Sequence, residues 1–407
     1  MKSGSCRALF LGVTLLLWPE RFCLAGQVDD EPGANARMRL GDVRLAPSVA
    51  FNTGIDTNIF NASDQPSSDV ISTLSSKTEA WMRAGPARVS GKGSVDFVYF
   101  QNTATERTVN LDGSIRLAVP LNHVEPYAMT SFLRTRERPA VEIDARSLRK
   151  EQSVSLGTGV RISGRSSVQF AATMSEVRFD AGAVFLETSL GDVLNRDDTT
   201  WRVSLRHQLT PLTTLTIGAE TTDDRFVLSP LRNSRSIRVA PELEFAASAL
   251  VSGRASVGYR AFDARDPSVP DFNGMVAAVD LAYTLLGSTR FTFQANRDVE
   301  YSYEITAPYY VIAGLGGGLV QRVTDSMGIT TRCGLFNLNY RSLAPEAVNA
   351  DSRVDSITFY GGGVIHKIGR DLRVSVNVDY NRRHSAVVWR EYNSVRAGVS
   401  IVYGLKS

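Results

Sequence analysis

The stretch Glu391–Tyr403, EYNSVRAGVSIVY, decides the fold, because its side chains alternate between two faces. One face is largely apolar and ends in an aromatic ring, and it consists of Asn393, Val395, Ala397, Val399, Ile401 and Tyr403. The other face is polar or small, and it consists of Ser394, Arg396, Gly398, Ser400 and Val402. A side-chain period of two is typical of a β-strand, so the stretch is predicted to be one.

The same stretch carries the pattern polar-x-Gly-x-x-apolar-x-aromatic, at Arg396, Gly398, Ile401 and Tyr403. It resembles the closing strand of bacterial outer-membrane β-barrels, the signal that the barrel assembly machinery recognises. Such signals usually end at the C-terminus with Phe or Trp, whereas four residues, 404–407, follow a Tyr here. An exposed strand of a soluble β-protein is the alternative, and the rest of the chain must decide between them.

The composition excludes several classes of protein. The 407 residues are 43% hydrophobic and 21% charged, which is too polar for a helical membrane protein and too apolar for disorder. No apolar run reaches the roughly 18 residues that a spanning helix needs. A net charge of +3 gives no indication of a nucleic-acid partner. The four histidines have no ligand-spaced partners, so neither a metal nor a cofactor is expected.

The N-terminus reads as a signal peptide, residues 1–25. Lys2 and Arg7 precede a short apolar core, and small residues surround the cleavage position after Ala25. Cleavage would leave Cys333 as the only cysteine, so the mature chain is expected to have no internal disulfide. Residues 26–42 are predicted to be a short periplasmic segment, and residues 43–404 a transmembrane β-barrel.

The connections between alternating segments predict the barrel most directly, because short and long links alternate along the chain. The short links are at Gly85–Pro86, 120–122, 163–165, 210–212, 247–248, 286–288, 324–326 and 368–370. The long polar links are at 56–70, 136–150, 180–198, 263–271 and 341–353. We therefore expect an all-β, antiparallel up-and-down barrel of about 18 strands, with 16 as the fallback, tight periplasmic turns and long extracellular loops. Val43–Ile55 would pair with the last strand to close the ring.

The two faces of the strands predict an inside-out protein. Apolar positions would meet lipid, and polar positions would line water, since unpaired polar groups cannot fill a dry core. The residues expected to line the pore are Arg161, Arg202, Arg206, Arg238, Glu242, Glu244, Arg254, Arg260, Arg373 and Asp379. This set leans basic, which favours a preference for anions. The alternative is that these residues pair across strands and brace the wall.

Two motifs that suggest chemistry are discounted. Gly314–Gly318 resembles a phosphate loop, but no helix follows it to hold a phosphate. His384 and Ser385, with Asp379 nearby, are the only candidates for a hydrolase site at the outer rim. Adjacent residues of a strand point in opposite directions, so no catalytic residue is predicted.

The start of the barrel resembles the β-barrel porin family associated with exopolysaccharide export (β-barrel porin 2-like). The matching residues are Pro47–Phe51 and Gly54–Phe60, although Thr57 separates Asp56 from Asn58 where the family has them adjacent. The resemblance extends over about Arg39 to Tyr403. It implies an outer-membrane channel for an extracellular polysaccharide, and it brings no catalytic residue or cofactor.

The sequence therefore favours an outer-membrane channel that exports an acidic exopolysaccharide handed over by periplasmic export proteins. Outer-membrane lipid, lipopolysaccharide and the barrel assembly machinery are the other expected partners. Three alternatives remain: a general anion-leaning diffusion porin, an outer-membrane enzyme that modifies lipid or glycan, and an adhesion scaffold.

Overall fold

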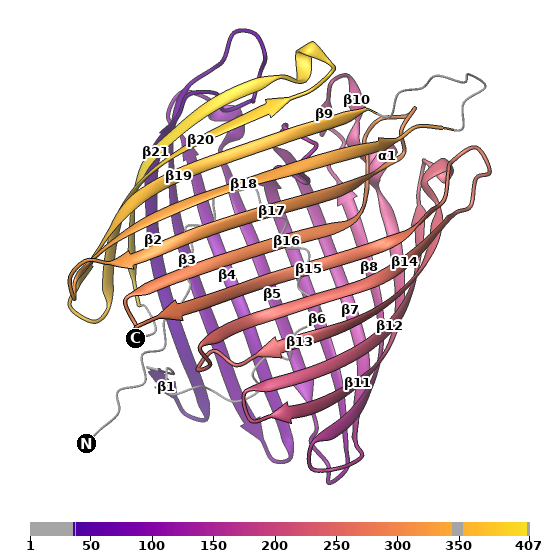
Figure 1. Cartoon of the computed structure of the whole chain (residues 1–407), viewed down its shortest axis with the longest axis vertical. Helices are drawn as coiled ribbons and strands as arrows, with labels where there is room; N and C mark the ends of the chain where they lie inside the picture. Colours follow the sequence, from indigo (N-terminus) through magenta and orange to yellow (C-terminus); the bar gives the residue numbers. More distant parts are fainter. Residues whose placement is uncertain (1–35, 37, 344–352, 405–407) are drawn as a thin grey trace.

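The protein is a closed antiparallel β-barrel of eighteen strands in a computed structural model that describes residues 36, 38–343 and 353–404 (Figure 1). The expected signal peptide lies outside the described residues. The strands of the barrel are β2 Val43–Asp56, β3 Asp69–Ala84, β4 Ala87–Phe100, β5 Thr108–Ala118, β6 Val124–Glu137, β7 Ser147–Arg161, β8 Ser166–Phe179, β11 Arg196–Thr210, β12 Thr213–Phe226, β13 Ser234–Phe245, β14 Val251–Ala264, β15 Phe272–Leu285, β16 Thr289–Tyr301, β17 Tyr309–Arg322, β18 Met327–Arg341, β19 Val354–Ile368, β20 Leu372–His384 and β21 Tyr392–Tyr403. The predicted fold and strand number are confirmed.

Short elements complete the described chain. They are β1 Met38–Leu40, β9 Val184–Phe185, β10 Thr188–Ser189, helix α1 Leu190–Leu194, and the 3₁₀ turns η2 Ala104–Glu106, η3 Pro230–Arg232 and η4 Val388–Arg390. None of the helices in the described part of the chain has the length and apolar character needed to cross a bilayer.

The ring closes where β2 pairs with β21, as predicted for the first and last strands. Gly54 of β2 lies directly opposite Gly398 of β21. A side chain at Gly54 would place its Cβ 2.5 Å from the carbonyl oxygen of Ala397, so the seam requires glycine there. Beyond the end of β21, β1 pairs with the start of β2. Closure pairs the first strand with the last, so neither of them exposes a free edge to lipid along Val49–Asp56 and Arg396–Tyr403.

Tight turns lie at the end of the barrel that carries both chain termini, and the longer connections lie at the other end (Figure 1). The turn between β3 and β4 has two residues, whereas the loop between β8 and β11 spans residues 180–195. Bacterial barrels keep their short turns in the periplasm, which defines the end with the long loops as the outer end.

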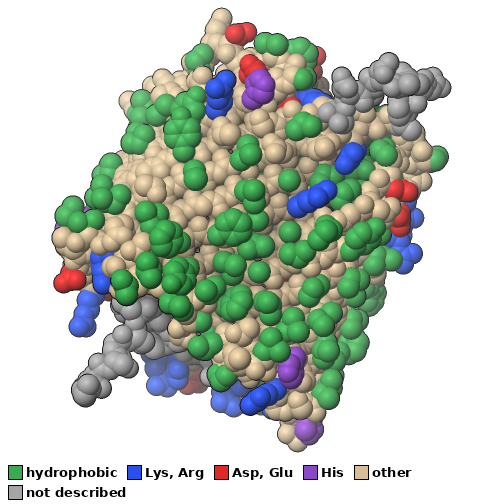
Figure 2. All heavy atoms as spheres, in the orientation of Figure 1, with side chains coloured by type: hydrophobic (Ala, Val, Ile, Leu, Met, Phe, Trp, Pro, Cys, Tyr) green, Lys and Arg blue, Asp and Glu red, His purple; other side chains and the backbone are tan. Residues whose placement is uncertain are grey.

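The outward face of the strands is apolar, as Figure 2 shows for one side of the barrel. Val376 and Val378 of β20 are each 51% exposed, whereas Asp379, the next residue, is buried. Trp201 of β11 is 59% exposed on the outward face, next to lumen-facing Arg202. Such exposure would be unfavourable in water and suits a lipid environment.

Candidate functional site

The lumen contains a cavity of about 1820 Å³. It extends from residues 138–146, the loop between β6 and β7, to Ala247 in a periplasmic turn. A barrel of this strand number leaves an aqueous interior unless loops enter it. The cavity is therefore the candidate site, and its walls and its outer end determine what can pass.

Two rows of hydroxyl side chains run across neighbouring strands in register on the lumen side, and all of them except Thr222 and Ser236 line the cavity. The first row runs over four strands, through Ser114, Ser131, Ser153 and Ser175. The second runs over five strands, through Ser155, Thr173, Thr200, Thr222 and Ser236. Neighbours within the rows are close, with 2.7 Å between the Oγ atoms of Ser131 and Ser153. Each hydroxyl both donates and accepts, so these hydroxyl rows offer a continuous neutral hydrogen-bonding surface.

Charged side chains in the cavity wall are balanced in sign. Among the described residues that line it, thirteen are Lys or Arg and fourteen are Asp or Glu. Several are paired across strands: Arg202 with Glu220, and Arg206 with Glu244 at 3.2 Å. The basic bias expected from the sequence does not match this lining, because carboxylates from neighbouring strands offset the arginines. Bracing of the wall accounts for these pairs directly.

The structure places most of the expected pore-lining residues in the cavity wall. Those in the wall are Arg202, Arg206, Arg238, Glu242, Glu244, Arg254 and Asp379. The other three share the lumen-side register without lining the cavity. Arg161 lies exposed at the periplasmic end of β7, and Arg373 is half-buried near the start of β20. Arg260 donates to Asp298 and to Ser236, which hold it against the wall.

Residues 138–146, here called the crossing loop, close the cavity on the outer side. The loop starts between β6 and β7 and reaches the loop between β16 and β17, which lies almost half the ring away. Ser302 Oγ donates to Glu142 Oε1 at 2.7 Å, and the Tyr303 amide donates to Oε2 at 3.2 Å. Near its start, Arg138 donates to the Ile59 carbonyl at 3.0 Å. The crossing loop is thus anchored to two other outer loops, β2–β3 and β16–β17.

A buried ion network holds the middle of the crossing loop. Arg383 of β20, whose side chain is 0% exposed, donates to the Glu142 carbonyl at 3.0 Å and to Asp144 at 3.1 Å. The same guanidinium pairs with Asp355 at 2.8 Å. Arg390 also donates to the Glu142 carbonyl. Buried charges are tolerated only when paired and hydrogen-bonded in this way.

Glu142 is the most perturbed acid of the crossing loop. It is fully buried, and this burial raises the pKa of its carboxyl group to about 7. The nearby Glu304 raises the pKa further, whereas the hydrogen bond from Ser302 and the charges of Arg390 and Arg383 lower it. The carboxyl group therefore changes its charge near neutral pH. The same group accepts the hydrogen bonds from Ser302 and Tyr303 in the β16–β17 loop.

The outer end of the β16–β17 hairpin, residues 298–312, also enters the lumen, and it is called the inserted hairpin here. Pairing of β15 with β16 stops at Arg297, although β16 stays paired with β17 as far as Tyr301. The Tyr301 hydroxyl donates to Asp224 of β12 at 2.6 Å, and its ring lies 4.7 Å from that of Phe226. The hairpin tip has left the wall and packs against the inner side of other strands.

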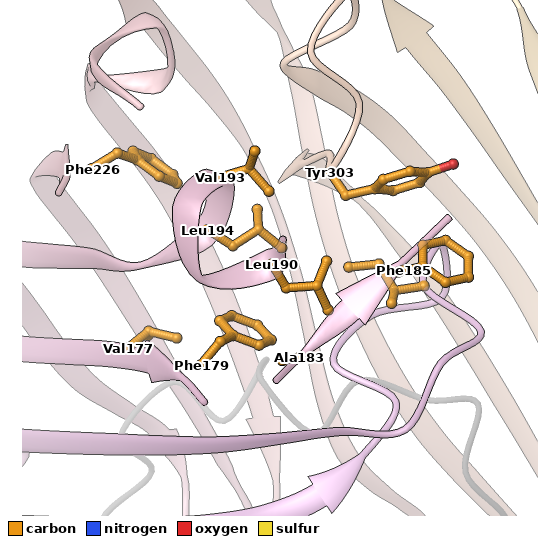
Figure 3. Close-up of a cluster of buried hydrophobic side chains, with 10 residues drawn as sticks. Val177, Phe179, Ala183, Phe185, Leu190, Val193, Leu194, Phe226 and Tyr303 are labelled. Atoms are coloured by element: carbon orange, nitrogen blue, oxygen red, sulfur yellow. The ribbon is translucent and has the colours of Figure 1, made fainter. Parts of the chain in front are cut away.

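Three apolar clusters fill the space around these two insertions. The first joins Ile143 to the segment 180–195 and to Tyr303, and Figure 3 shows α1 packed among these side chains. The second packs Val141 against lumen-facing residues of β17–β19, which are Tyr310, Ile312, Phe336, Leu338, Tyr340 and Ile357. The third joins the inserted hairpin to the inner faces of β14 and β15. We call the crossing loop, the inserted hairpin and segment 180–195 together the plug.

The plug is not among the features predicted from the sequence. Residues 136–150 were expected only to form a long outer loop, and residues 309–312 are apolar on both faces. The hydrolase candidates are separated, as predicted. His384 Nδ1 lies 2.7 Å from Glu391 on the exposed side, whereas buried Ser385 donates to Asp355 at 2.6 Å.

The comparisons agree with this architecture. The family model described as "Putative beta-barrel porin 2" matches residues 31–404. The chain belongs to this porin family. Membership establishes an outer-membrane porin fold located in the bacterial outer membrane, as predicted. A search of curated proteins gives no match.

Solved outer-membrane proteins share the fold of this β-barrel porin. OccK3 (OpdO) of Pseudomonas aeruginosa is 8% identical with a TM-score of 0.51, covering 88% of this chain and 95% of its own. OpdK of the same organism, crystallised with vanillate, is 10% identical with a TM-score of 0.50, covering 89% and 99%. At these identities the likeness extends to the fold alone.

Proposed function

We propose that this porin exports a polysaccharide chain, which enters from the periplasm and leaves when the plug moves. The hydroxyl rows are the observation that carries the proposal. They cover the cavity wall from β5 to β11 with groups that match the hydroxyls of sugars, and they impose no fixed charge. The family resemblance drawn from the sequence supports the same cargo.

The charge balance of the wall bears on the cargo. An acidic chain was expected from the lumenal arginines, yet carboxylates offset them in the lining. Paired charges still bind sugar hydroxyls, because a guanidinium donates and a carboxylate accepts. We therefore place the hydroxyl groups of the chain, and not its acidic groups, as the main determinant of recognition.

Conductance in planar bilayers tests the proposal. The mature protein should show low, intermittent conductance, and a variant with the crossing loop shortened should conduct steadily. A neutral oligosaccharide and an acidic one of equal length should both reduce the steady current. If no oligosaccharide reduces it while small ions and solutes pass freely, the carbohydrate part of the proposal is wrong.

A diffusion porin for small anions is the second candidate. OpdK was crystallised with vanillate, a carboxylate, and arginines from several strands line the lumen of this chain. Block of the current by vanillate-like carboxylates, with none by oligosaccharides, would favour it. The filled outer lumen favours a third candidate, a surface scaffold, which would be supported if neither the protein nor its loop-shortened variant conducts.

A further inference from the structure

Three cations lie directly opposite one another on the lipid-facing side of β6, β7 and β8. Arg134 pairs in register with Lys150, and Lys150 pairs with Arg178. These three residues are called the cation row. Directly opposite side chains have Cβ atoms about 4.5–5.5 Å apart, and like charges in such positions repel each other. The row therefore has an electrostatic cost that something else must offset.

Protein carboxylates offset only one end of the cation row. Arg178 lies 2.8 Å from Glu176 and 2.5 Å from Asp197. Arg134 donates to the carbonyl of Val109 at 3.1 Å, and Lys150 is exposed. Within the described residues, no carboxylate forms an ion pair with either of these two. The nearest further pair, Arg136 with Glu106 at 3.8 Å, belongs to a different position of β6.

The height of the cation row in the barrel identifies the kind of anion. Phe132 lies two residues closer to the periplasm than Arg134, on the same face of β6, and its side chain is exposed. Exposed Val154 of β7 and Met174 of β8 lie four residues from Lys150 and Arg178. A strand rises about 3.3 Å per residue and is tilted by about 35–45°, so the row lies roughly 5–10 Å beyond the apolar belt, on the outer side. Head groups of the outer leaflet lie at that height.

We propose that the cation row binds a phosphate on the head group of an outer-leaflet glycolipid. A phosphate between Arg134 and Lys150 accepts hydrogen bonds from both and removes their repulsion. The acyl chains of the same lipid then cover the apolar side chains below, beginning with Phe132. This site lies on the outside of the barrel and does not depend on what the lumen carries.

Lipid titration of the detergent-solubilised full-length protein tests the proposal. Bisphosphorylated lipid A should bind and raise the thermal unfolding temperature, and the dephosphorylated form with the same acyl chains should bind more weakly. Each surface cation contributes about five-fold to attraction of anionic lipid. The double variant Arg134→Gln/Lys150→Gln should therefore bind lipid A about 25-fold more weakly. The control is Arg382→Gln, at an exposed position whose cross-strand neighbours are the neutral Thr358 and Asn393.

The row also predicts a result without lipid. In a neutral detergent, Lys150→Gln should leave the unfolding temperature unchanged or raise it, because it removes repulsion. A loss of stability would show that Lys150 has a structural role and would contradict the proposal. Equal binding of lipid A by the double variant and Arg382→Gln would overturn it. So would a matching effect of inorganic phosphate alone, because the head group would then not be the occupant.

Discussion

The outer part of the lumen and its periplasmic part are built from the same strands, yet they carry opposite kinds of side chain. Toward the periplasm, the wall has hydroxyls and charge pairs around a cavity of about 1820 Å³. Toward the outside, Tyr310, Phe336 and Leu338 face inward and pack against inserted segments. The wall is polar where it meets water and apolar where other parts of the protein cover it. The polarity of its side chains therefore indicates which part of the lumen is filled.

Shortening the crossing loop should change the difference between the filled and the open part of the lumen most. Replacing residues 139–145 by two glycines removes Val141, Glu142 and Asp144 and should open the outer end. Conductance in planar bilayers should rise at least about ten-fold, because a filled lumen then becomes an aqueous one. The matched control shortens residues 103–106, which neither line the cavity nor join the apolar clusters. Equal conductance of the two variants would show that the loop does not close the channel.

Breaking an ion pair should cost far more in the plug than in the open cavity. Arg383→Met removes one buried partner from Asp355, which keeps Arg353, and one from Asp144, which keeps Arg390, and should lower the free energy of unfolding by up to about 3–5 kcal/mol. Arg206→Met breaks a pair with Glu244, whose side chains are 28% and 50% exposed, and should cost about 0–1 kcal/mol. Urea unfolding in lipid vesicles measures both. Similar costs would contradict the distinction between filled and open regions.

The closed position should weaken as pH rises. Burial raises the pKa of Glu142 from 4.5 to about 7, so the closed plug binds a proton that an exposed loop would release. This contribution, roughly 3 kcal/mol, is fully present below pH 4.5 and is lost as pH rises to 7. Channel opening should therefore increase over that range and level off above it.

Glu142→Gln provides the control for this pH dependence. Its neutral amide imitates the protonated carboxyl group and should keep the channel closed at pH 8, where the wild type opens most. Arg390, Arg383 and Glu304, which face this group, remain in place in the variant. If the variant and the wild type share one pH profile of conductance, another group controls the opening.

Removing a single hydroxyl from the cavity wall should have the smallest effect. Ser153→Val deletes one donor and acceptor of a hydroxyl row, and one hydrogen bond is worth about 0.5–1.5 kcal/mol. In the loop-shortened protein, block by a neutral oligosaccharide should need about two- to ten-fold more sugar. Ser76→Val, on the lipid-facing side of β3, is the control. Equal block in both variants would remove the role of the hydroxyl rows.

The same comparison shows how far the sequence could lead. Strand number and face assignment follow from strict alternation wherever lipid and water meet the two sides, as in β20 and β21. The glycine seam at Gly54 and Gly398 lies within segments whose period was clear.

The plug could not be predicted, because alternation alone does not say which face is inside. In β18, Phe336, Leu338 and Tyr340 face the lumen, and Asn337 and Asn339 face outward, so polarity is reversed there. The loop that covers these side chains explains the reversal. The path of a loop cannot be predicted from side-chain periodicity, because a loop has none. The arginines of the wall could likewise be predicted from the sequence. The carboxylates beside them could not, because the pairing register of neighbouring strands brings them together.

Access to Ser153 from the two sides of the membrane tests the central claim most directly. In a chain whose native cysteines are replaced by serine, Ser153→Cys provides one thiol in the cavity wall. A membrane-impermeant maleimide should label it from the periplasmic side and leave it unlabelled when applied to the outside of intact cells. Rapid labelling from the outside would contradict a lumen closed at its outer end.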